Sequence, residues 1–179
     1  EAIRGADYVV LQLEIPLETV YYTIGFARRH GVRTILNPAP GQALDLARIA
    51  AADYVIPNET EAEAMTGTAD VRAAARALIE GGVRRVIVTL GGNGALLAGA
   101  EGMRTVEPFA VNAVDTTGAG DAFIGSLAVF LAEGREETEA VRRANLYAAL
   151  STTAAGTMKS FAAREEFERE WALRGASGL

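Results

Sequence analysis

Short apolar runs alternate with helical patterns through the first half of this 179-residue chain. The runs of strand length cover residues 8–13, 33–36, 54–56 and 85–90. Between them, apolar residues recur at helical spacing in residues 17–30, 44–50, 59–65 and 71–80. Strands that are apolar on both faces and alternate with helices are typical of a parallel sheet that helices cover on both sides. The sequence therefore predicts an α/β fold, a three-layer sandwich with a mostly parallel central sheet.

The second half continues with two short strands, at residues 95–98 and 104–108, around a Gly-rich turn. Helical patterns follow after Asp121, at residues 137–154 and at residues 163–173. No linker or internal repeat divides the chain, so we expect residues 1–179 to belong to one domain. Because Glu1 begins what looks like the end of a helix, we expect the chain to be the later part of a longer protein.

Composition excludes several classes of function. The net charge of −6 and the lack of any Lys/Arg run argue against nucleic acid as a partner. The chain has no cysteine, which excludes disulfides, thiol nucleophiles and Cys-ligated metals. No apolar stretch reaches membrane-spanning length, so we expect no membrane partner. The lack of cysteine is compatible with a reducing cytoplasm, and a cytoplasmic location is the expectation. The single histidine, His30, ends a helical pattern, so acid–base chemistry has to rest on carboxylates, Lys or Tyr.

The stretch from Val111 to Phe123, V-N-A-V-D-T-T-G-A-G-D-A-F, places two glycines where a loop turns into an apolar helix. The first amides of a helix have no partner inside it, and Gly118, Ala119 and Gly120 are small enough to let an anion approach them. Asp121 adds a carboxylate in the same turn. This pairing suits a reaction in which a hydroxyl loses a proton while charge develops on a phosphoryl group. The structural alternative is that Gly118 caps the helix and Asp121 interacts with the helix dipole.

Other polar residues follow the predicted strands, at the edge where parallel sheets bind ligands. They are Glu14, Asn37, Asn58 and residues 91–94. Asn58 and Glu61 have the spacing of a capping box at a helix start. The functional alternative places both near nucleotide phosphates, with Glu61 holding Mg²⁺ through water.

Glu14 stands between Leu13 and Ile15, and a charge in such apolar surroundings needs a partner, either a sugar hydroxyl or a lysine. Residues 89–94, T-L-G-G-N-G, lack the lysine of a P-loop and the helix-opening pattern of a dinucleotide site. They form either a simple turn or a backbone wall beside ATP.

Oxygen-bearing groups surround the helix start at Asp121. Asp115, Thr117 and the loop from Gly156 to Ser160 supply carboxylate, hydroxyl and carbonyl oxygens. Hard cations prefer oxygen ligands, so these residues are candidates for a monovalent cation site.

Four motifs in the same order resemble the ribokinase-like (pfkB) family of carbohydrate kinases. D-T-T-G-A-G-D-A-F, residues 115–123, closely resembles the second signature of that family. The segments V-L-Q-L-E-I-P, I-L-N-P-A-P and P-N-E-T-E-A-E look most like its ribose-phosphorylating branch; they are residues 10–16, 35–40 and 57–63. The resemblance runs from the first residue into the final helix.

The resemblance implies a role for each candidate residue. Asp121 would be the base that takes the proton of a sugar 5-hydroxyl, and the amides from Gly118 to Asp121 would form the anion hole. Glu14 would contact the sugar, and Glu61 would belong to the Mg²⁺ network. The ATP contacts implied are Asn58, Thr89, Leu90, Gly91, Gly92, Asn93, Gly94, Gly120, Asp121 and Asn145.

The resemblance also implies a potassium site. Its ligands would be Asp115, Thr117, Ser151, Ala154, Gly156 and Ser160. Two positions depart from the family pattern: Thr157 follows the glycine where Ala is more common, and Ala154 replaces a common Arg. The family's N-terminal part, with most sugar contacts and a β-sheet lid that mediates dimerisation, has no counterpart in these residues.

The interpretation is therefore an ATP-dependent kinase that phosphorylates D-ribose at its 5-hydroxyl, with Mg²⁺ and K⁺, and that dimerises through the lid. Residues 1–179 would be its nucleotide-binding and catalytic part, inactive in isolation. One alternative is another kinase of the family that acts on fructose, a keto-deoxy sugar acid or a nucleoside. A second is a catalytically silent nucleotide-binding module.

Overall fold

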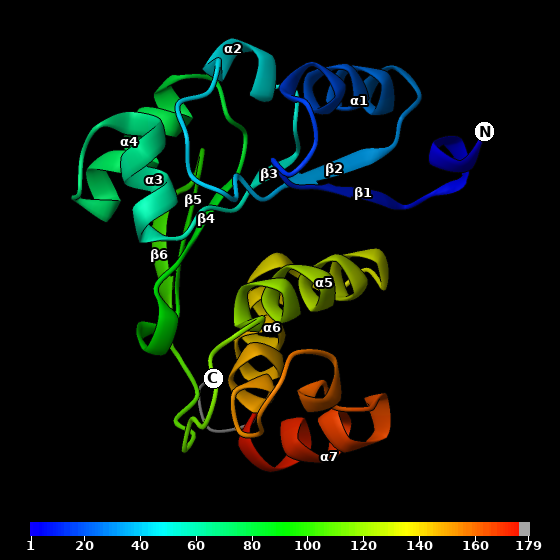
Figure 1. The fold of residues 1–179 in the computed structure, drawn as a ribbon, viewed down its shortest axis with the longest axis vertical. Helices are drawn as coiled ribbons and strands as arrows, with labels where there is room; N and C mark the ends of the chain where they lie inside the picture. The colour runs from blue at the N-terminus through cyan, green and yellow to red at the C-terminus, as the bar shows by residue number, and fades with distance from the viewer. Residues whose placement is uncertain (176–179) are drawn as a thin grey trace. The chain divides into compact units, whose positions relative to one another are not determined.

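The computed structural model describes residues 1–175, which form two compact units (Figure 1). The first unit comprises residues 1–91 and 95–105, and the second comprises residues 92–94 and those from 106 onward. Among the described residues, no helix combines the length and apolar character needed to cross a membrane.

The first unit is built on a sheet of six strands in the order β1-β2-β3-β4-β5-β6. The strands are β1 (Tyr8–Leu11), β2 (Arg33–Leu36), β3 (Tyr54–Val55), β4 (Val86–Thr89), β5 (Ala95–Gly99) and β6 (Gly102–Val106). Strands β1 to β4 are parallel, with Val10 opposite Ile35 and Val55 opposite Val86, and β5 runs antiparallel to β4. The predicted mostly parallel sheet is confirmed.

Helices follow the parallel strands and pack on them (Figure 1). The helical segments are the 3₁₀ turns η1 (Ala2–Gly5) and η2 (Gly91–Asn93) and the helices α1 (Leu17–Arg29), α2 (Leu46–Ile49), α3 (Glu59–Thr66) and α4 (Val71–Glu80). Fully buried Ile24 of α1 and Leu78 of α4 join Leu36 and Val88 of the strands in one apolar core. In β2 and β4, consecutive residues rather than alternate ones are buried, as in the interior of a parallel sheet.

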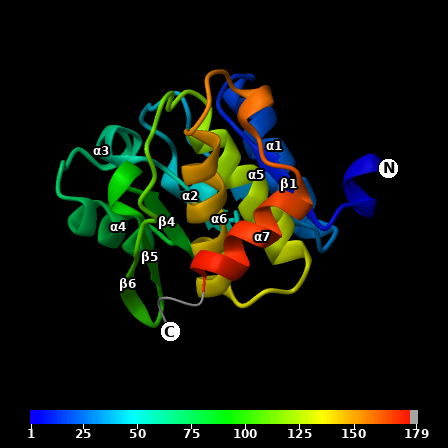
Figure 2. The ribbon, with the colours of Figure 1, turned by 90° about the horizontal axis from the view of Figure 1, so that it is seen from below.

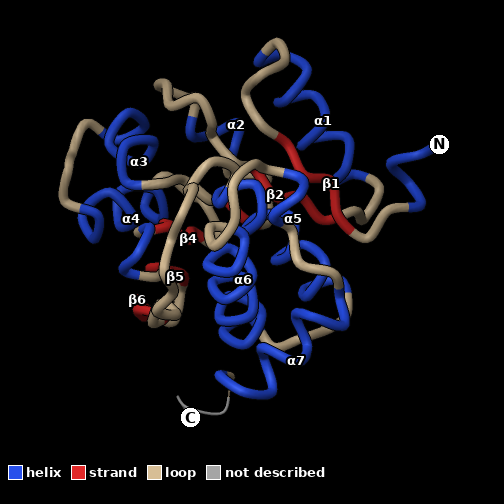
Figure 3. Tube along the Cα trace, turned by 60° about the horizontal axis from the view of Figure 1, so that its bottom comes forward, coloured by secondary structure: helices blue, strands red, loops and turns tan. Residues whose placement is uncertain are grey.

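The second unit is helical. It contains α5 (Ala119–Ala132), α6 (Glu137–Ser151), the 3₁₀ turn η3 (Met158–Ser160) and α7 (Arg164–Arg174). Leu127 of α5 and Leu146 of α6 are fully buried. The ring of Phe130 in α5 lies 5.2 Å from that of Phe167 in α7, and Figure 2 shows the three helices gathered together. Figure 3 shows the long loop, residues 107–118, that precedes α5.

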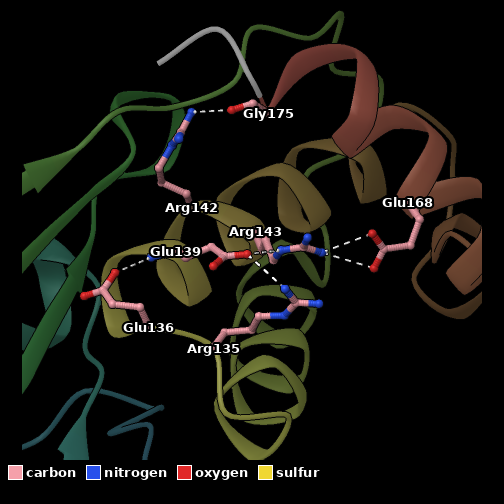
Figure 4. Close-up of polar contacts among 7 residues, drawn as sticks. All are labelled: Arg135, Glu136, Glu139, Arg142, Arg143, Glu168 and Gly175. Carbon is pink, nitrogen blue, oxygen red and sulfur yellow. Dashed lines mark hydrogen bonds and ion pairs between the residues drawn. The ribbon is translucent and has the colours of Figure 1, made fainter. Parts of the chain in front are cut away.

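A buried arginine fastens α7 to α6. Arg143, 5% exposed, donates from Nε to Glu139 Oε1 at 3.0 Å and from one terminal nitrogen to Glu168 Oε1 at 3.1 Å (Figure 4). Its guanidinium also lies 4.4 Å from the ring centre of Trp171. Two carboxylates and an aromatic face thus compensate the buried charge, which would otherwise be costly.

The ends of several elements differ from the prediction. The predicted helix 137–154 ends at Ser151. Ser151, Thr152 and Thr153 each donate a hydroxyl to the carbonyl three residues back, which competes with continuing the helix. The predicted strand at 104–108 is β6, which ends at Val106. Helix α5 begins at Ala119, which places Asp121 inside its first turn.

Candidate functional site

The start of α5 in the second unit is capped by a glycine rather than by a side chain. Gly118 has a left-handed backbone, φ 80°, and no side-chain hydrogen bond caps the helix. A β-carbon on Gly118 would come within 3.1 Å of Thr157 Cγ2, so both backbone and space favour glycine here. By contrast, a β-carbon on Gly120 would meet no protein atom within 4 Å. The surface above Gly120 is therefore open to a ligand.

Asp121 is the third residue of α5, and it is exposed. The amide of Ala119 donates to Thr116 O at 3.2 Å, which closes the turn before the helix. Of the amides that the sequence assigns to the anion hole, that of Ala119 is thus already used within the turn. The amides of Gly120 and Asp121 lie in the first helical turn, where no carbonyl of the same helix can accept from them.

Asp115 ties the loop before α5 to the loop after α6. Its Oδ1 accepts from Thr117 N at 2.9 Å, and its Oδ2 accepts from Gly156 N at 3.0 Å. These hydrogen bonds, first from Gly156 and then from Thr117, lower the pKa of Asp115 to about 2. Thr152 O reinforces the junction by accepting from the amides of Val114 and Asp115 at 2.7 and 3.1 Å. The carboxylate is therefore ionised under all ordinary conditions.

The structure brings together three of the predicted potassium ligands, Asp115, Thr117 and Gly156. The hydroxyls of Ser151 and Ser160 donate to Ala148 O and Thr157 O, both at 2.8 Å. A donating hydroxyl keeps lone pairs that can face a cation. Hard cations prefer oxygen ligands, and the ionised Asp115 carboxylate with the Thr117 hydroxyl beside it supplies such oxygens. Potassium at this position stays a prediction.

Asn145 is buried in α6, where its amide holds the segment after β6. Its Nδ2 donates to Val106 O at 3.3 Å and to Glu107 O at 3.1 Å. Gly94 lies against the same segment: a β-carbon there would overlap the carbonyl oxygen of Val106 and come within 2.9 Å of Pro108 N. Both residues thus fix residues 106–108, a structural role that the sequence did not reveal for either.

In the first unit, Asn58 and Glu61 form the predicted capping box at the start of α3. Asn58 Oδ1 accepts from Glu61 N at 2.8 Å, and Glu61 Oε2 accepts from Asn58 N at 2.9 Å. The amide of Asn58 also donates from Nδ2 to Glu61 Oε1 at 2.9 Å. The capping-box interpretation is confirmed, and the polar groups of Asn58 are directed mainly at Glu61.

Glu61 is a buried carboxylate, only 8% exposed. Burial raises the pKa of Glu61, while hydrogen bonds from Asn58 and from Asn37 oppose that rise. Asn37, at the end of β2, donates from Nδ2 to Glu61 Oε2 at 3.4 Å. Sequence reasoning placed Asn37 at this edge but gave it no role, and its pairing with a residue 24 positions away had no local signal.

Thr89 lies beside Asn58 in the first unit. The two residues form an isolated parallel bridge, and Thr89 N donates to Pro57 O at 3.0 Å. Leu90 and Gly91 follow Thr89 in the first unit. Gly92 and Asn93, the next two residues, are exposed and belong to the second unit.

Glu14 is exposed, so the argument that burial forces it to find a partner was wrong. The apolar neighbours Leu13 and Ile15 suggested that Glu14 is buried. However, β1 already ends at Leu11, and it lies at the edge of the sheet. A sugar contact of Glu14 stays a prediction.

Among the described residues, no group of three or more His, Cys, Asp or Glu side chains could enclose a metal ion. Mg²⁺, however, keeps several waters and is often bound through one or two carboxylates together with substrate phosphates. Glu61, a buried carboxylate whose hydrogen-bond donors are neutral amides, fits such a water-mediated role.

A mostly apolar hollow of about 270 Å³ lies beside Asp121 within the second unit. Its walls include Gly125 and Val129 of α5, Tyr147 of α6 and Phe167 of α7.

A mostly parallel sheet in the first unit and a glycine-capped helix start in the second are both features that recur in proteins that bind phosphate groups. The model of the pfkB family of carbohydrate kinases matches residues 2–164, and the chain belongs to that family. The deoxyribokinase of Salmonella typhi is 43% identical over 179 residues, which cover 97% of this chain and 58% of that protein. The ribokinase of Haemophilus influenzae is 37% identical and covers 92% of this chain and 55% of its own length.

Solved structures show the same fold. The ribokinase of Thermotoga maritima matches with a TM-score of 0.84 at 39% identity, over 94% of this chain and 57% of that chain. The ribokinase of Arabidopsis thaliana, solved with ribose and ATP, matches with a TM-score of 0.88 at 29% identity, over 93% of this chain and 56% of that chain. The chain thus spans little more than half the length of these four relatives.

Proposed function

We propose that this protein transfers the γ-phosphoryl group of ATP to the 5-hydroxyl of D-ribose. The observation that carries the proposal is the start of α5, where a left-handed glycine cap leaves a side-chain carboxylate, Asp121, and open space above Gly120 in one turn. Relatives named ribokinase support the choice of sugar, as does the likeness to a ribokinase solved with ribose and ATP.

In this mechanism, Asp121 accepts the proton of the sugar hydroxyl as the oxygen attacks the γ-phosphorus. The amides of Gly120 and Asp121 donate to the phosphoryl oxygens as negative charge develops on them. Gly118 contributes by its backbone conformation, which directs the turn, and Ala119 by closing it. Positioning and charge stabilisation of this kind supply most of the catalysis in phosphoryl transfer.

For the nucleotide, we propose contacts from Asn58, from residues 89–94 and from the Gly120–Asp121 turn. Since the amide of Asn145 is used by Val106 and Glu107, this residue acts on the adenine by holding the segment after β6. Mg²⁺ bound to the phosphates would neutralise their charge, and Glu61 would hold its hydration shell. Potassium would be held by Asp115, Thr117, Ser151, Ala154, Gly156 and Ser160 and would support the loop before α5.

We further propose that residues 1–179 are the nucleotide-binding and catalytic part of a ribokinase-like domain. Glu14 is the sugar contact proposed here besides Asp121, and other contacts, the lid and the homodimer would come from family regions outside these residues. The fraction of the relatives' length covered, 58% and 55%, supports this division. We therefore expect the isolated 179-residue chain to bind ATP weakly and to phosphorylate ribose negligibly.

A second candidate substrate is 2-deoxy-D-ribose, because two relatives named deoxyribokinase are each 43% identical to this chain. Steady-state kinase assays of the full-length protein with ribose, 2-deoxyribose, fructose and a nucleoside decide between them. The proposal requires ribose to give the highest kcat/KM. Preference for deoxyribose would reassign the sugar, and the absence of sugar-dependent ADP release with every sugar would favour a silent nucleotide-binding module.

A further inference from the structure

Asn37 occupies a fixed position at the carboxyl end of β2. It is 7% exposed, and its backbone amide donates to Leu11 O at 2.8 Å. Its side-chain Nδ2 donates in two directions, to Ile56 O at 3.0 Å and to Glu61 Oε2 at 3.4 Å. The side-chain amide is thus held by the sheet on one side while it reaches the first turn of α3 on the other.

The Glu61 carboxylate has a second set of donors, the backbone and side-chain amides of Asn58, both at 2.9 Å. Asn58 caps the helix that carries Glu61 and bridges to Thr89 at the end of β4, so these bonds hold the carboxylate relative to α3 and to β4. The bond from Asn37 adds a donor from a second strand end, that of β2.

We propose that Asn37 is a positioning residue, whose amide orients the buried Glu61 carboxylate toward the hydration shell of the divalent cation that accompanies ATP. This proposal rests on the proposed kinase function. All the amide donors to the carboxylate are neutral, so they orient its charge without cancelling it. The charge remains available to the waters of a cation, and Mg²⁺ is a cation that keeps such waters.

Residues that orient metal-binding groups from the outside have a measurable effect. Loss of such a partner typically lowers metal affinity about 10- to 100-fold. For a carboxylate that acts through water, we expect the lower end, about a tenfold rise in the Mg²⁺ concentration that half-saturates the enzyme. Substitution of Asn37 should change the dependence of activity on Mg²⁺ and should leave the affinity for metal-free nucleotide unchanged.

The competing explanation is that Asn37 only satisfies the carbonyl of Ile56. A double-mutant cycle separates the two roles. Asn37→Leu keeps the approximate volume and removes both donated bonds, and Asn37→Asp keeps the shape but sets a second carboxylate against Glu61. Each is made in the full-length protein with Glu61 intact and with Glu61→Gln, and melting temperatures report any loss of fold.

Two readouts are used. The first is the Mg²⁺ dependence of kcat and of KM for ATP, and the second is Mn²⁺ binding to the protein with a non-hydrolysable ATP analogue, followed by water-proton relaxation. We expect both Asn37 variants to weaken Mn²⁺ binding, Asp more than Leu, while either change has little further effect once Glu61 is Gln. Folded variants with unchanged Mn²⁺ binding, or with equal losses in both backgrounds, would overturn the proposal. Because Mn²⁺ binding needs no turnover, a protein without kinase activity would overturn the proposed function while the Mn²⁺ result still decides the role of Asn37.

Discussion

Two helices of this protein begin with an acid at the same position and use it in opposite ways. Glu61 is the third residue of α3, and Asp121 is the third residue of α5. In α3 a side chain, Asn58, caps the helix, and the acid folds back to complete a capping box. In α5 a left-handed glycine caps the helix, and the acid is exposed.

The comparison shows that the capping residue decides what an acid at this position can do. An asparagine cap accepts from the helix amide and donates to the acid, so both become part of the fold. A glycine cap offers no side-chain acceptor for the helix amides, and in α5 the acid is exposed at the surface. The predictions below test this division from the largest expected effect to the smallest.

The largest effect should come from Asp121→Asn, which removes the proton acceptor and keeps the shape. We expect kcat of the full-length protein to fall by about 10² to 10⁴, the range typical for loss of a general base. Nucleotide affinity should change little, and an exposed acid near a helix start contributes only about 0.3–1 kcal/mol of stability. Steady-state kinetics and thermal melts measure both. Near-normal turnover would reduce Asp121 to the structural role of a dipole acid.

The two glycines at the start of α5 should respond in opposite ways to alanine. Gly118→Ala places a side chain in a left-handed conformation, which costs about 1–2 kcal/mol before the contact with Thr157 is counted. Gly120→Ala meets no protein atom, and alanine has the better helix propensity, so stability should hold or rise. Activity of Gly120→Ala should nevertheless fall, because the methyl group occupies the space proposed for the phosphoryl group. Denaturant unfolding and kinase assays of both variants measure these effects. A fully active Gly120→Ala variant would contradict the proposed phosphoryl position.

Potassium should affect the loop that precedes α5 and should have no effect on α3. We expect activity to rise when potassium replaces sodium or tetramethylammonium at constant ionic strength, because the ion would support the loop that Asp115 and Gly156 join. Asp115→Asn is the matched variant, since it keeps the size of the side chain and removes the negative charge. Equal rates in the three salts would remove the proposed cation site.

Removing the cap of α3 should lower the free energy of unfolding. Asn58→Ala removes the cap, and loss of such a cap costs about 0.5–2 kcal/mol. It also removes the side-chain donor to the buried Glu61 carboxylate, so the upper part of that range is expected. Asn58→Asp is the control, because aspartate caps equally well but repels Glu61. Urea unfolding of both variants measures the difference; an Asp variant as stable as the original would show that the Asn58–Glu61 hydrogen bond contributes little.

The smallest effect concerns the stability of the protein at low pH. Because the folded pKa of Asp115, about 2, lies below its ordinary value of 3.8, its hydrogen bonds stabilise the folded state in full at any pH well above 3.8. This contribution should be lost as the pH falls through about 2. The stability difference between the original protein and Asp115→Asn should therefore be constant at neutral pH and shrink only in strong acid. Chemical unfolding across this range measures it, and a difference that already vanishes near pH 5 would contradict the hydrogen bonding described.

Much of the fold could be predicted because its signals are local. The bounds of β2 and α4 agree with the predicted residues 33–36 and 71–80, since both have clear apolar periodicity. The capping box of α3 was predictable because its two residues are three positions apart. The start of α5 was placed correctly to within a turn, because glycines before an apolar helix have a strong local meaning.

What the sequence determined, then, were the elements, the family motifs and the residues that start the helices. What only the tertiary structure decided were the partners across the chain. Asn37 meets Glu61 over 24 positions, Asn145 meets Val106 over 39, and Asp115 meets Gly156 over 41. The exposure of Glu14 belongs with these, because it depends on where β1 ends at the edge of the sheet. Such contacts depend on how distant segments pack, whereas periodicity and capping arise from hydrogen bonds and burial within a few residues.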